Sequence, residues 1–251
     1  GSHAGGSDRV DGDAGLPQGG GQVGRERRSG ALREESPDFG VRGQGSTARP
    51  RDESEGSLAR LEAAGYEAYV VGGAVREALR GGDTHDWDLT TSALPAQTEA
   101  VFAGERVIET GLRHGTVTVL LAGLPLEITT FRVDGGYSDH RRPDTVRFAR
   151  SLREDLSRRD FTMNALAYRP RDGVTDLFGG AAAVRAGLVR CVGDPDRRFQ
   201  EDALRMLRAL RFSATLGMTI EQDTAAAIRR NQDLLREIAP ERVQTELTKL
   251  L

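Results

Sequence analysis

The run Val71-Gly72-Gly73-Ala74-Val75-Arg76, followed ten residues later by Asp86-Trp87-Asp88, decides the fold predicted for this sequence. Apolar residues up to Val71 predict a strand, the two glycines a turn, and Ala74–Arg80 a helix. Residues 86–91 predict a second strand. Glycines at such a turn let backbone N–H groups approach a phosphate, and a helix N-terminus favours an anion. Taken alone, the double glycine is more often a plain strand–helix turn.

Asp86 and Asp88 are the candidates for a metal site. Side chains alternate along a strand, so both carboxylates are expected on one face. Such a pair can share two hard cations about 3.5–4 Å apart, which clamp the attacking and leaving oxygens of a phosphoryl transfer. Glu127, in a later hairpin, is a third carboxylate that could be a metal ligand or a base. An outward-facing strand glutamate is nearly as good an interpretation of Glu127.

The pattern around these residues predicts an α+β fold. Helical spacing occurs at Leu58–Ala64 and Pro95–Ala103, and the strands Thr116–Leu121 and Leu126–Phe131 are close enough to form a hairpin. We expect a small mixed β-sheet with helices on one face, because a doubly wound fold needs a longer series of alternating strands and helices. From Phe199 onward the pattern predicts an all-helical neck.

The chain divides into three predicted parts: a disordered tail over residues 1–56, a head domain over 57–170, and a linker and helical neck over 171–251. The tail lacks apolar runs and begins with Gly1-Ser2-His3, which resembles an expression-tag remnant. The polar residues 133–144 predict a mobile loop. The last helix, from Pro240, ends within its apolar pattern, which indicates that the natural protein continues.

Composition narrows the class of protein further. The net charge is −3, and arginine supplies all of the 35 basic residues except Lys249. Planar guanidinium groups suit phosphate and base recognition, although a GC-rich genome produces the same bias. Cys191 is the single cysteine, which excludes an intramolecular disulfide and suits a reducing cytoplasm. No stretch approaches the roughly 18 apolar residues of a membrane span, and neither a membrane nor a protein partner is predicted.

Five blocks in order resemble the class II tRNA nucleotidyltransferases and bacterial poly(A) polymerases, within the nucleotidyltransferase superfamily. They are residues 71–76 with 86–93, 110–119, 137–144, 155–165 and 198–212. The resemblance implies a cytoplasmic enzyme that adds C and A from CTP and ATP to the tRNA 3′ end, with two Mg²⁺ ions held by Asp86 and Asp88. The nucleotide-binding residues that it implies are Gly72, Gly73, Arg76, Arg159, Asp202, Arg205, Arg208 and Arg211.

One helix expected over Glu201–Phe212 carries a polar stripe at three-residue spacing, opposite Leu204, Leu207 and Leu210. Cytosine and adenine share an amino donor beside a ring-nitrogen acceptor, where uracil and guanine present a carbonyl. Asp202 could accept from the amino group and Arg205 could donate to the ring nitrogen, which is the role that the resemblance gives them. The structural alternative is an i,i+3 salt bridge between the two.

Several alternatives remain open. Bacterial poly(A) polymerases carry a basic Gly-Arg/Lys-Arg-Phe segment, whereas Thr110–Thr116 resembles the tRNA enzymes. Relatives that add only CC lack the flexible loop, so residues 134–144 favour full CCA addition or A addition alone. A non-catalytic nucleotide- or RNA-binding module would be expected to lose Asp86 and Asp88 first. His114 has no Cys or Ser nucleophile nearby and is interpreted as structural.

Overall fold

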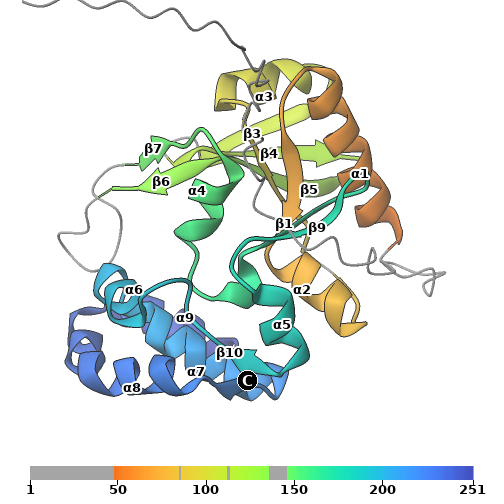
Figure 1. The fold of residues 1–251 in the computed structure, drawn as a ribbon. Helices are drawn as coiled ribbons and strands as arrows, with labels where there is room; N and C mark the ends of the chain where they lie inside the picture. The colour runs from red at the N-terminus through yellow and green to blue at the C-terminus, as the bar shows by residue number, and fades with distance from the viewer. Residues whose placement is uncertain (1–47, 85, 112–113, 136–145, 251) are drawn as a thin grey trace, which may run out of the picture. The chain divides into compact units, whose positions relative to one another are not determined.

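The computed structural model describes residues 48–84, 86–111, 114–135 and 146–250, and a mixed seven-stranded sheet is the centre of this part of the chain (Figure 1). The strand order is β3-β4-β5-β2-β1-β8-β9. Only β2 and β5 run parallel among the neighbouring strands of this described sheet. The strands are β1 Ala68–Val71, β2 Asp88–Thr91, β3 Arg106–Gly111, β4 Thr116–Leu121, β5 Leu124–Thr130, β8 Leu166–Arg169 and β9 Gly173–Asp176. The predicted α+β class, the mixed sheet and the β4–β5 hairpin are confirmed.

Helices cover both faces of this sheet. They are α1 Ala48–Ala63, α2 Gly73–Arg80, α3 Pro95–Val101, α4 Leu152–Ser157 and α5 Gly180–Arg185. Val70 of β1 belongs to the larger apolar cluster with Leu61 of α1, whereas its neighbour Tyr69 belongs to a second cluster with Leu156 of α4. Because consecutive strand residues point to opposite faces, α4 lies on the face opposite α1. Helices were expected on one face of the sheet only, and the short helix α4 on the opposite face departs from that expectation.

Two boundaries differ from the sequence-based division. Helix α1 begins at Ala48, so part of the tail predicted over residues 1–56 is helical, and Ser54 in it is fully buried. Once the helical turn around Leu58 has formed, each residue added towards the N-terminus of α1 gains a backbone hydrogen bond at little further cost. The small side chain of Ser54 fits against the core. Strand β9 ends at Asp176, past the expected limit of 170, because it pairs with β8. The division into three domains otherwise stays a prediction.

A small hairpin, β6 Arg132–Asp134 with β7 Val146–Phe148, stands apart from the main sheet. Its first strand takes up the beginning of the loop predicted over residues 133–144. Residues 136–145 of that loop lie outside the described part of the chain. Helix α4 follows β7 and returns the backbone to the sheet.

The neck contains α6 Pro195–Glu201, α7 Leu204–Leu216, α8 Gln222–Asn231 and α9 Pro240–Thr248, with a 3₁₀ segment at Gln232–Glu237. The expectation of an all-helical neck is corrected in one respect, since β10 Leu188–Val189 pairs in parallel with β11 Thr219–Ile220. Figure 1 shows the four helices gathered on one side of the sheet, beneath α4.

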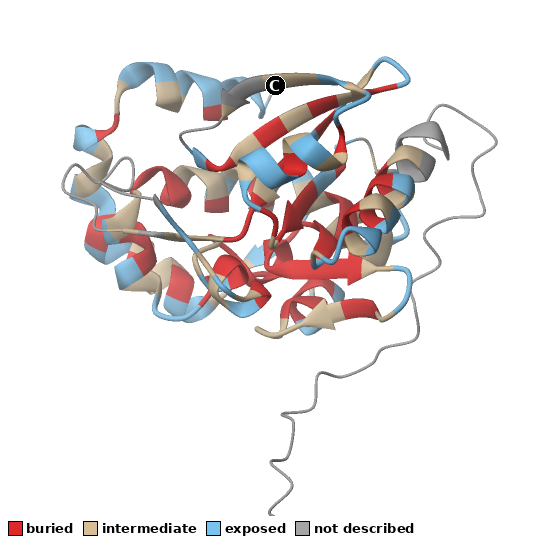
Figure 2. Ribbon diagram, turned by 90° about the horizontal axis from the view of Figure 1, so that it is seen from above, coloured by how far each residue is buried: buried red, intermediate tan, exposed pale blue. Residues whose placement is uncertain are grey.

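The apolar core continues from the sheet into the neck without a gap. The larger cluster includes Phe161 beside the sheet and Phe199, Met206 and Phe212 in the neck. The Phe161 and Phe212 rings meet edge to face, with centroids 5.9 Å apart. Figure 2 shows buried residues along the central strands and on the inner helix faces. Among the described residues, no helix has the length and apolarity that a bilayer crossing requires.

Candidate functional site

The glycine turn between β1 and α2 has the geometry that the sequence predicts. Gly72 has φ of 73°, a left-handed conformation that favours glycine, and its N–H donates to the Leu166 carbonyl at 3.2 Å. A Cβ at Gly72 would lie 3.3 Å from Nη1 of Arg159. Helix α2 begins at Gly73, so its positive N-terminal end is placed beside an arginine side chain.

Arg76 lies one turn into α2 and is held from two sides. Its Nη1 donates to Oδ1 of Asn164, and its Nε donates to Glu77 at 2.9 Å. Its guanidinium carbon lies 5.2 Å from the centroid of the Phe212 ring, within cation–π range. A charged group from the head thus rests on an aromatic ring of the neck, at the glycine turn.

The two aspartates stand at the start of β2. Asp88 is the first residue of the strand and is paired in register with Glu127 on β5, whereas Asp86 precedes the strand. The prediction that both lie on one strand is therefore wrong for Asp86, because pairing with β1 begins only at Asp88. Desolvation first, and then the negative charges of Glu127 and Asp86, raise the pKa of Asp88, although Arg159 opposes them.

A cavity of about 560 Å³ brings most of the predicted site residues together. The aspartates Asp86 and Asp88 also line a second cavity of about 430 Å³, and Glu127 lines only that second cavity. Arg211 lines neither cavity. The predicted residues in the larger cavity are Gly72, Gly73, Arg76, Asp86, Asp88, Arg159, Asp202, Arg205 and Arg208.

The carboxylate pair fits a divalent cation by its chemistry. Both side chains are exposed to a cavity, and the charge of Asp86 adds to the factors that raise the pKa of Asp88, an effect that a bound cation would oppose. A compact three-carboxylate site is not assembled, since the described part of the chain holds no cluster of three or more His, Cys, Asp or Glu side chains suited to a metal ion. Asp86 and Asp88 are therefore the candidate ligands for a divalent cation in this cavity.

Asp155 organises the wall beside these aspartates. This fully buried carboxylate accepts from Arg158 at 2.9 and 3.1 Å, from Arg159 at 3.3 Å and from the Arg132 backbone N–H at 3.2 Å. Burial acts to raise the pKa of Asp155, but Arg158 and Arg159 outweigh burial and lower it. One buried anion thus fixes two arginines at the cavity.

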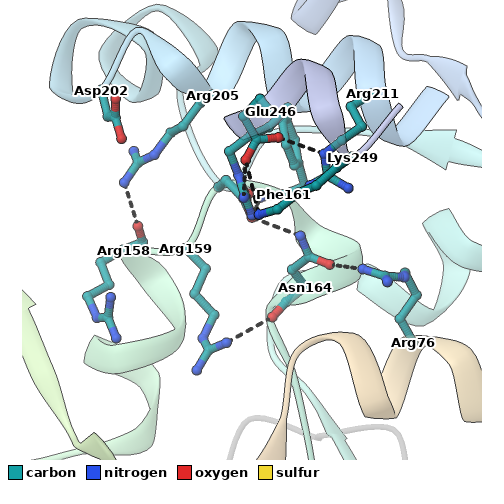
Figure 3. Close-up of polar contacts among 12 residues, drawn as sticks. Arg76, Arg158, Arg159, Phe161, Asn164, Asp202, Arg205, Arg211, Glu246 and Lys249 are labelled. Atoms are coloured by element: carbon teal, nitrogen blue, oxygen red, sulfur yellow. Dashed lines mark hydrogen bonds and ion pairs between the residues drawn. The ribbon is translucent and has the colours of Figure 1, made fainter. Parts of the chain in front are cut away.

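Asp160 organises the floor between head and neck. Its Oδ2 accepts from Arg208 Nε at 2.9 Å, and its Oδ1 accepts from the Phe161 N–H at 2.7 Å and from Asn164 at 3.0 Å. Burial alone would raise the pKa of Asp160, but Arg208 and the Asn164 hydrogen bond lower it to about 2. Since Asn164 also accepts from Arg76, a continuous polar chain joins α7 to α2 (Figure 3).

The single helix predicted over residues 201–212 is wrong. Helix α6 ends at Glu201, Asp202 has extended backbone angles (φ −148°, ψ 104°), and α7 begins at Leu204. Asp202 Oδ1 accepts from the Leu204 N–H at 3.1 Å, a local bond that competes with a continuous helix. Leu210, expected on the buried face, is 49% exposed. Leu204 is buried as expected, and Met206, Ala209 and Phe212 complete the buried face.

Asp202 and Arg205 do not pair with each other, so the i,i+3 salt bridge that was the structural alternative is absent between these two described residues. Asp202 pairs with Arg242 of α9 at 2.8 Å. Arg205 is buried, pairs with Glu201 at 2.8 Å and donates to the carbonyl oxygens of Arg198 and Arg158. Both side chains line the larger cavity.

Arg211, which was predicted to bind nucleotide, is placed elsewhere. Its Nε donates to buried Glu246 on α9 at 2.6 Å, and its guanidinium stacks on Phe212 at 4.1 Å. Arg208 reaches the same glutamate at 3.2 Å while keeping its place on the cavity. His114 is exposed, and its carbonyl oxygen accepts from Arg132 at 2.6 Å.

Three arginines on the cavity, Arg132, Arg158 and Arg242, had no predicted role. Arg158 could have been found from the sequence, because it adjoins Arg159 in the quoted block. Arg242 could not, since its contact with Asp202 joins residues 40 positions apart. Arg132 is the first residue of β6, in a hairpin that the sequence pattern did not predict.

Comparison with known proteins agrees with this architecture. A family model described as "Poly A polymerase head domain" matches residues 68–190, and another, "Probable RNA and SrmB- binding site of polymerase A", matches residues 217–251. A CCA-adding enzyme of Limosilactobacillus fermentum is 52% identical over 194 residues, covering 77% of this chain and 48% of the relative. One of Lactiplantibacillus plantarum is 53% identical over 191 residues, covering 76% and 46%.

Solved structures give the same result. The Bacillus stearothermophilus CCA-adding enzyme in complex with CTP matches with a TM-score of 0.74 and 46% identity, over 80% of this chain and 48% of that one. A complex of a CCA-adding enzyme with ATP matches with a TM-score of 0.68 and 26% identity, over 82% and 47%. The fold is thus that of a nucleotidyltransferase head and neck. The chain belongs to the family of class II tRNA nucleotidyltransferases and bacterial poly(A) polymerases. It spans about half the length of the curated relatives it matches.

Proposed function

We propose that this chain adds C and A nucleotides, from CTP and ATP, to the 3′ end of tRNA without a nucleic-acid template. The observation that carries the proposal is the single cavity of about 560 Å³, which has the glycine turn and Arg76, the aspartate pair, and Asp202 with Arg205 on its walls. Residues that suit a triphosphate, a divalent cation and a base edge therefore share one nucleotide-sized space.

The triphosphate would lie against the N-terminus of α2. The backbone N–H of Gly73 at the start of α2 suits a phosphate oxygen, Gly72 has no side chain to obstruct its approach, and the helix end supplies partial positive charge. Arg76 and Arg159 add full charges, and both are held in place by hydrogen bonds to Asn164. The two arginines are thus oriented before the nucleotide arrives, which lowers the cost of ordering them.

Asp86 and Asp88 would hold Mg²⁺, which when bound neutralises charge on the transferring phosphoryl group. The two residues also line the second cavity, which leaves their other side open to an RNA 3′-hydroxyl. Glu127 lines that second cavity, next to Asp88 in register, and would orient that hydroxyl or accept its proton. A metal-ligand role for Glu127 remains the alternative.

Asp202 and Arg205 would select the base. A carboxylate accepts from the exocyclic amino group of C or A, and a guanidinium donates to the adjacent ring nitrogen. Uracil and guanine present a carbonyl to the carboxylate, so they would leave two acceptors facing each other. Asp202 and Arg205 both lie on the cavity wall, which supports this role. They do not share one regular helix, because α6 ends before Asp202, so the role rests on their common cavity.

The poly(A) polymerase alternative and the enzymes that add only CC or only A differ in their products. The two segments that distinguish them in sequence, residues 110–116 and 134–144, are only partly within the described residues, which leave out 112–113 and 136–144 of them. We also propose that the protein is cytoplasmic, as its single cysteine, Cys191, leads us to expect.

Incubating the chain with Mg²⁺, labelled CTP and ATP, and a tRNA transcript that lacks its last three nucleotides tests the proposal. We expect sequential addition of C, C and A, resolved on a sequencing gel. Repeated A addition to any RNA would favour a poly(A) polymerase, and arrest after CC, or A addition only to a CC end, would favour the divided activities. No incorporation from either nucleotide would contradict catalysis.

A further inference from the structure

Helix α9 contacts Asp202, the candidate base-selecting residue, which lies in the extended break between α6 and α7. Arg242 of α9 meets Asp202 through two parallel contacts, Nη1 to Oδ1 at 3.2 Å and Nη2 to Oδ2 at 2.8 Å. Both side chains are mostly shielded from solvent, 23% and 18% exposed, and both line the larger cavity. Bidentate pairs of this kind fix geometry as well as charge.

These contacts fix the plane of the Asp202 carboxylate. Its Oδ1 accepts from Arg242 and from the Leu204 N–H, so rotation about the Cβ–Cγ bond would break three hydrogen bonds. Each carboxylate oxygen has two acceptor positions. Among the described residues, Oδ2 has Arg242 as its one partner, which leaves one acceptor position on Oδ2 for a further donor. An extended backbone at Asp202, without helical restraint, makes this side-chain anchor more important.

The same face of α9 holds the neighbouring arginines. Glu246, one turn after Arg242, is 3% exposed and accepts from Arg208 at 3.2 Å and from Arg211 at 2.6 Å. Burial acts to raise the pKa of Glu246, but its hydrogen bond with Arg211 and the charge of Arg208 lower it. Figure 3 shows Glu246 reaching down from α9 onto these arginines. Two successive turns of α9 are therefore tied to Asp202 and to α7, respectively.

We propose that Arg242 is a positioning residue that determines base choice, by holding the Asp202 carboxylate so that its open acceptor position faces the amino group of C or A. The inference rests on the proposed function and adds a specificity determinant to it. Arg242 need not touch the nucleotide: without it, Asp202 keeps its charge but loses the orientation that distinguishes an amino donor from a carbonyl. Triphosphate binding at Gly72, Gly73 and Arg76 does not depend on this pair.

Nucleotide binding to the whole chain tests the inference without requiring turnover. Dissociation constants for CTP, ATP, UTP, GTP and inorganic tripolyphosphate are measured by calorimetry with Mg²⁺, for wild type and for Arg242→Gln. We expect wild type to prefer CTP and ATP, and Arg242→Gln to reduce that preference about tenfold, the size of one base contact. Tripolyphosphate affinity should stay unchanged. Arg242→Lys, a point charge without the planar fork, should restore only part of the preference.

Arg236→Gln is the matched control, because Arg236 is 86% exposed in the 3₁₀ segment before α9. It should leave all five affinities at the wild-type value. If wild type discriminates and Arg242→Gln keeps the same ratio, or weakens all four nucleotides equally, Arg242 is merely structural and the inference fails while the proposed function stands. If wild type itself shows no preference, base selection at Asp202 fails and the inference fails with it.

Discussion

Replacing Asp88 with asparagine is expected to lower nucleotide incorporation by about three orders of magnitude, and Asp86→Asn should do the same. Removing one carboxylate charge weakens a stabilisation of the transferring phosphoryl group that is worth several kcal/mol. Neither variant should unfold the protein, because both side chains are exposed at the cavities. Single-turnover incorporation of labelled CTP with saturating Mg²⁺ measures the effect.

Asp233→Asn is a suitable control, since Asp233 is 83% exposed and lines neither cavity. It should match wild type in the same assay. Glu127→Gln is expected to have a smaller effect than either aspartate variant, because Glu127 lines only the second cavity. An Asp88→Asn protein with wild-type circular dichroism and near-normal turnover would show that the pair is not the catalytic metal site.

Asp160→Asn is expected to destabilise the fold by about 2 kcal/mol at pH 7. The pKa of Asp160 is lowered from 3.8 to about 2, so folding favours its charged form. This contribution is fully present above about pH 4 and is lost as the pH falls towards 2. The amide cannot be ionised, so the difference between variant and wild type should be greatest near neutrality and should shrink in acid.

Urea unfolding of both proteins at pH 7 and at pH 3 measures this difference. Asp233→Asn again serves as the control and should leave the free energy of unfolding within about 0.5 kcal/mol of wild type at both pH values. A variant as stable as wild type at pH 7 would mean that the Asp160–Arg208 pair does not hold head and neck together. A difference that grows on acidification would contradict the lowered pKa.

The fold near the glycine turn could be predicted because local signals agree there. The strand, the turn at Gly72 and the helix after it have their own patterns, and the hairpin of β4 and β5 has a turn at Gly123 with alternating burial. Strand β8 lacked such a signal, since its four residues Leu166–Arg169 are too few to show alternation. Its position depends on pairing with β1, a tertiary contact.

The site was predicted in its composition more than in its geometry. Asp88, Gly72 and Arg76 lie where strand and helix periodicity place them. The break at Asp202 escaped prediction because Asp202 shares the three-residue spacing of Arg205, Arg208 and Arg211 in α7, while its bond to the Leu204 N–H has no periodic signal. Arg242 belongs to the site through a contact between distant helices, which sequence spacing does not report.

The most direct test of the central claim, that one cavity selects C and A through Asp202, is a comparison of kcat/KM for CTP, ATP, UTP and GTP between wild type and Asp202→Ala, with Arg236→Gln as control. Removing the acceptor for the amino group should cost about 1–3 kcal/mol of discrimination. We therefore expect the ratio of kcat/KM for CTP to that for UTP to fall by about tenfold or more in Asp202→Ala and to stay unchanged in the control. A uniform loss for all four nucleotides, with the CTP-to-UTP ratio preserved, would contradict it.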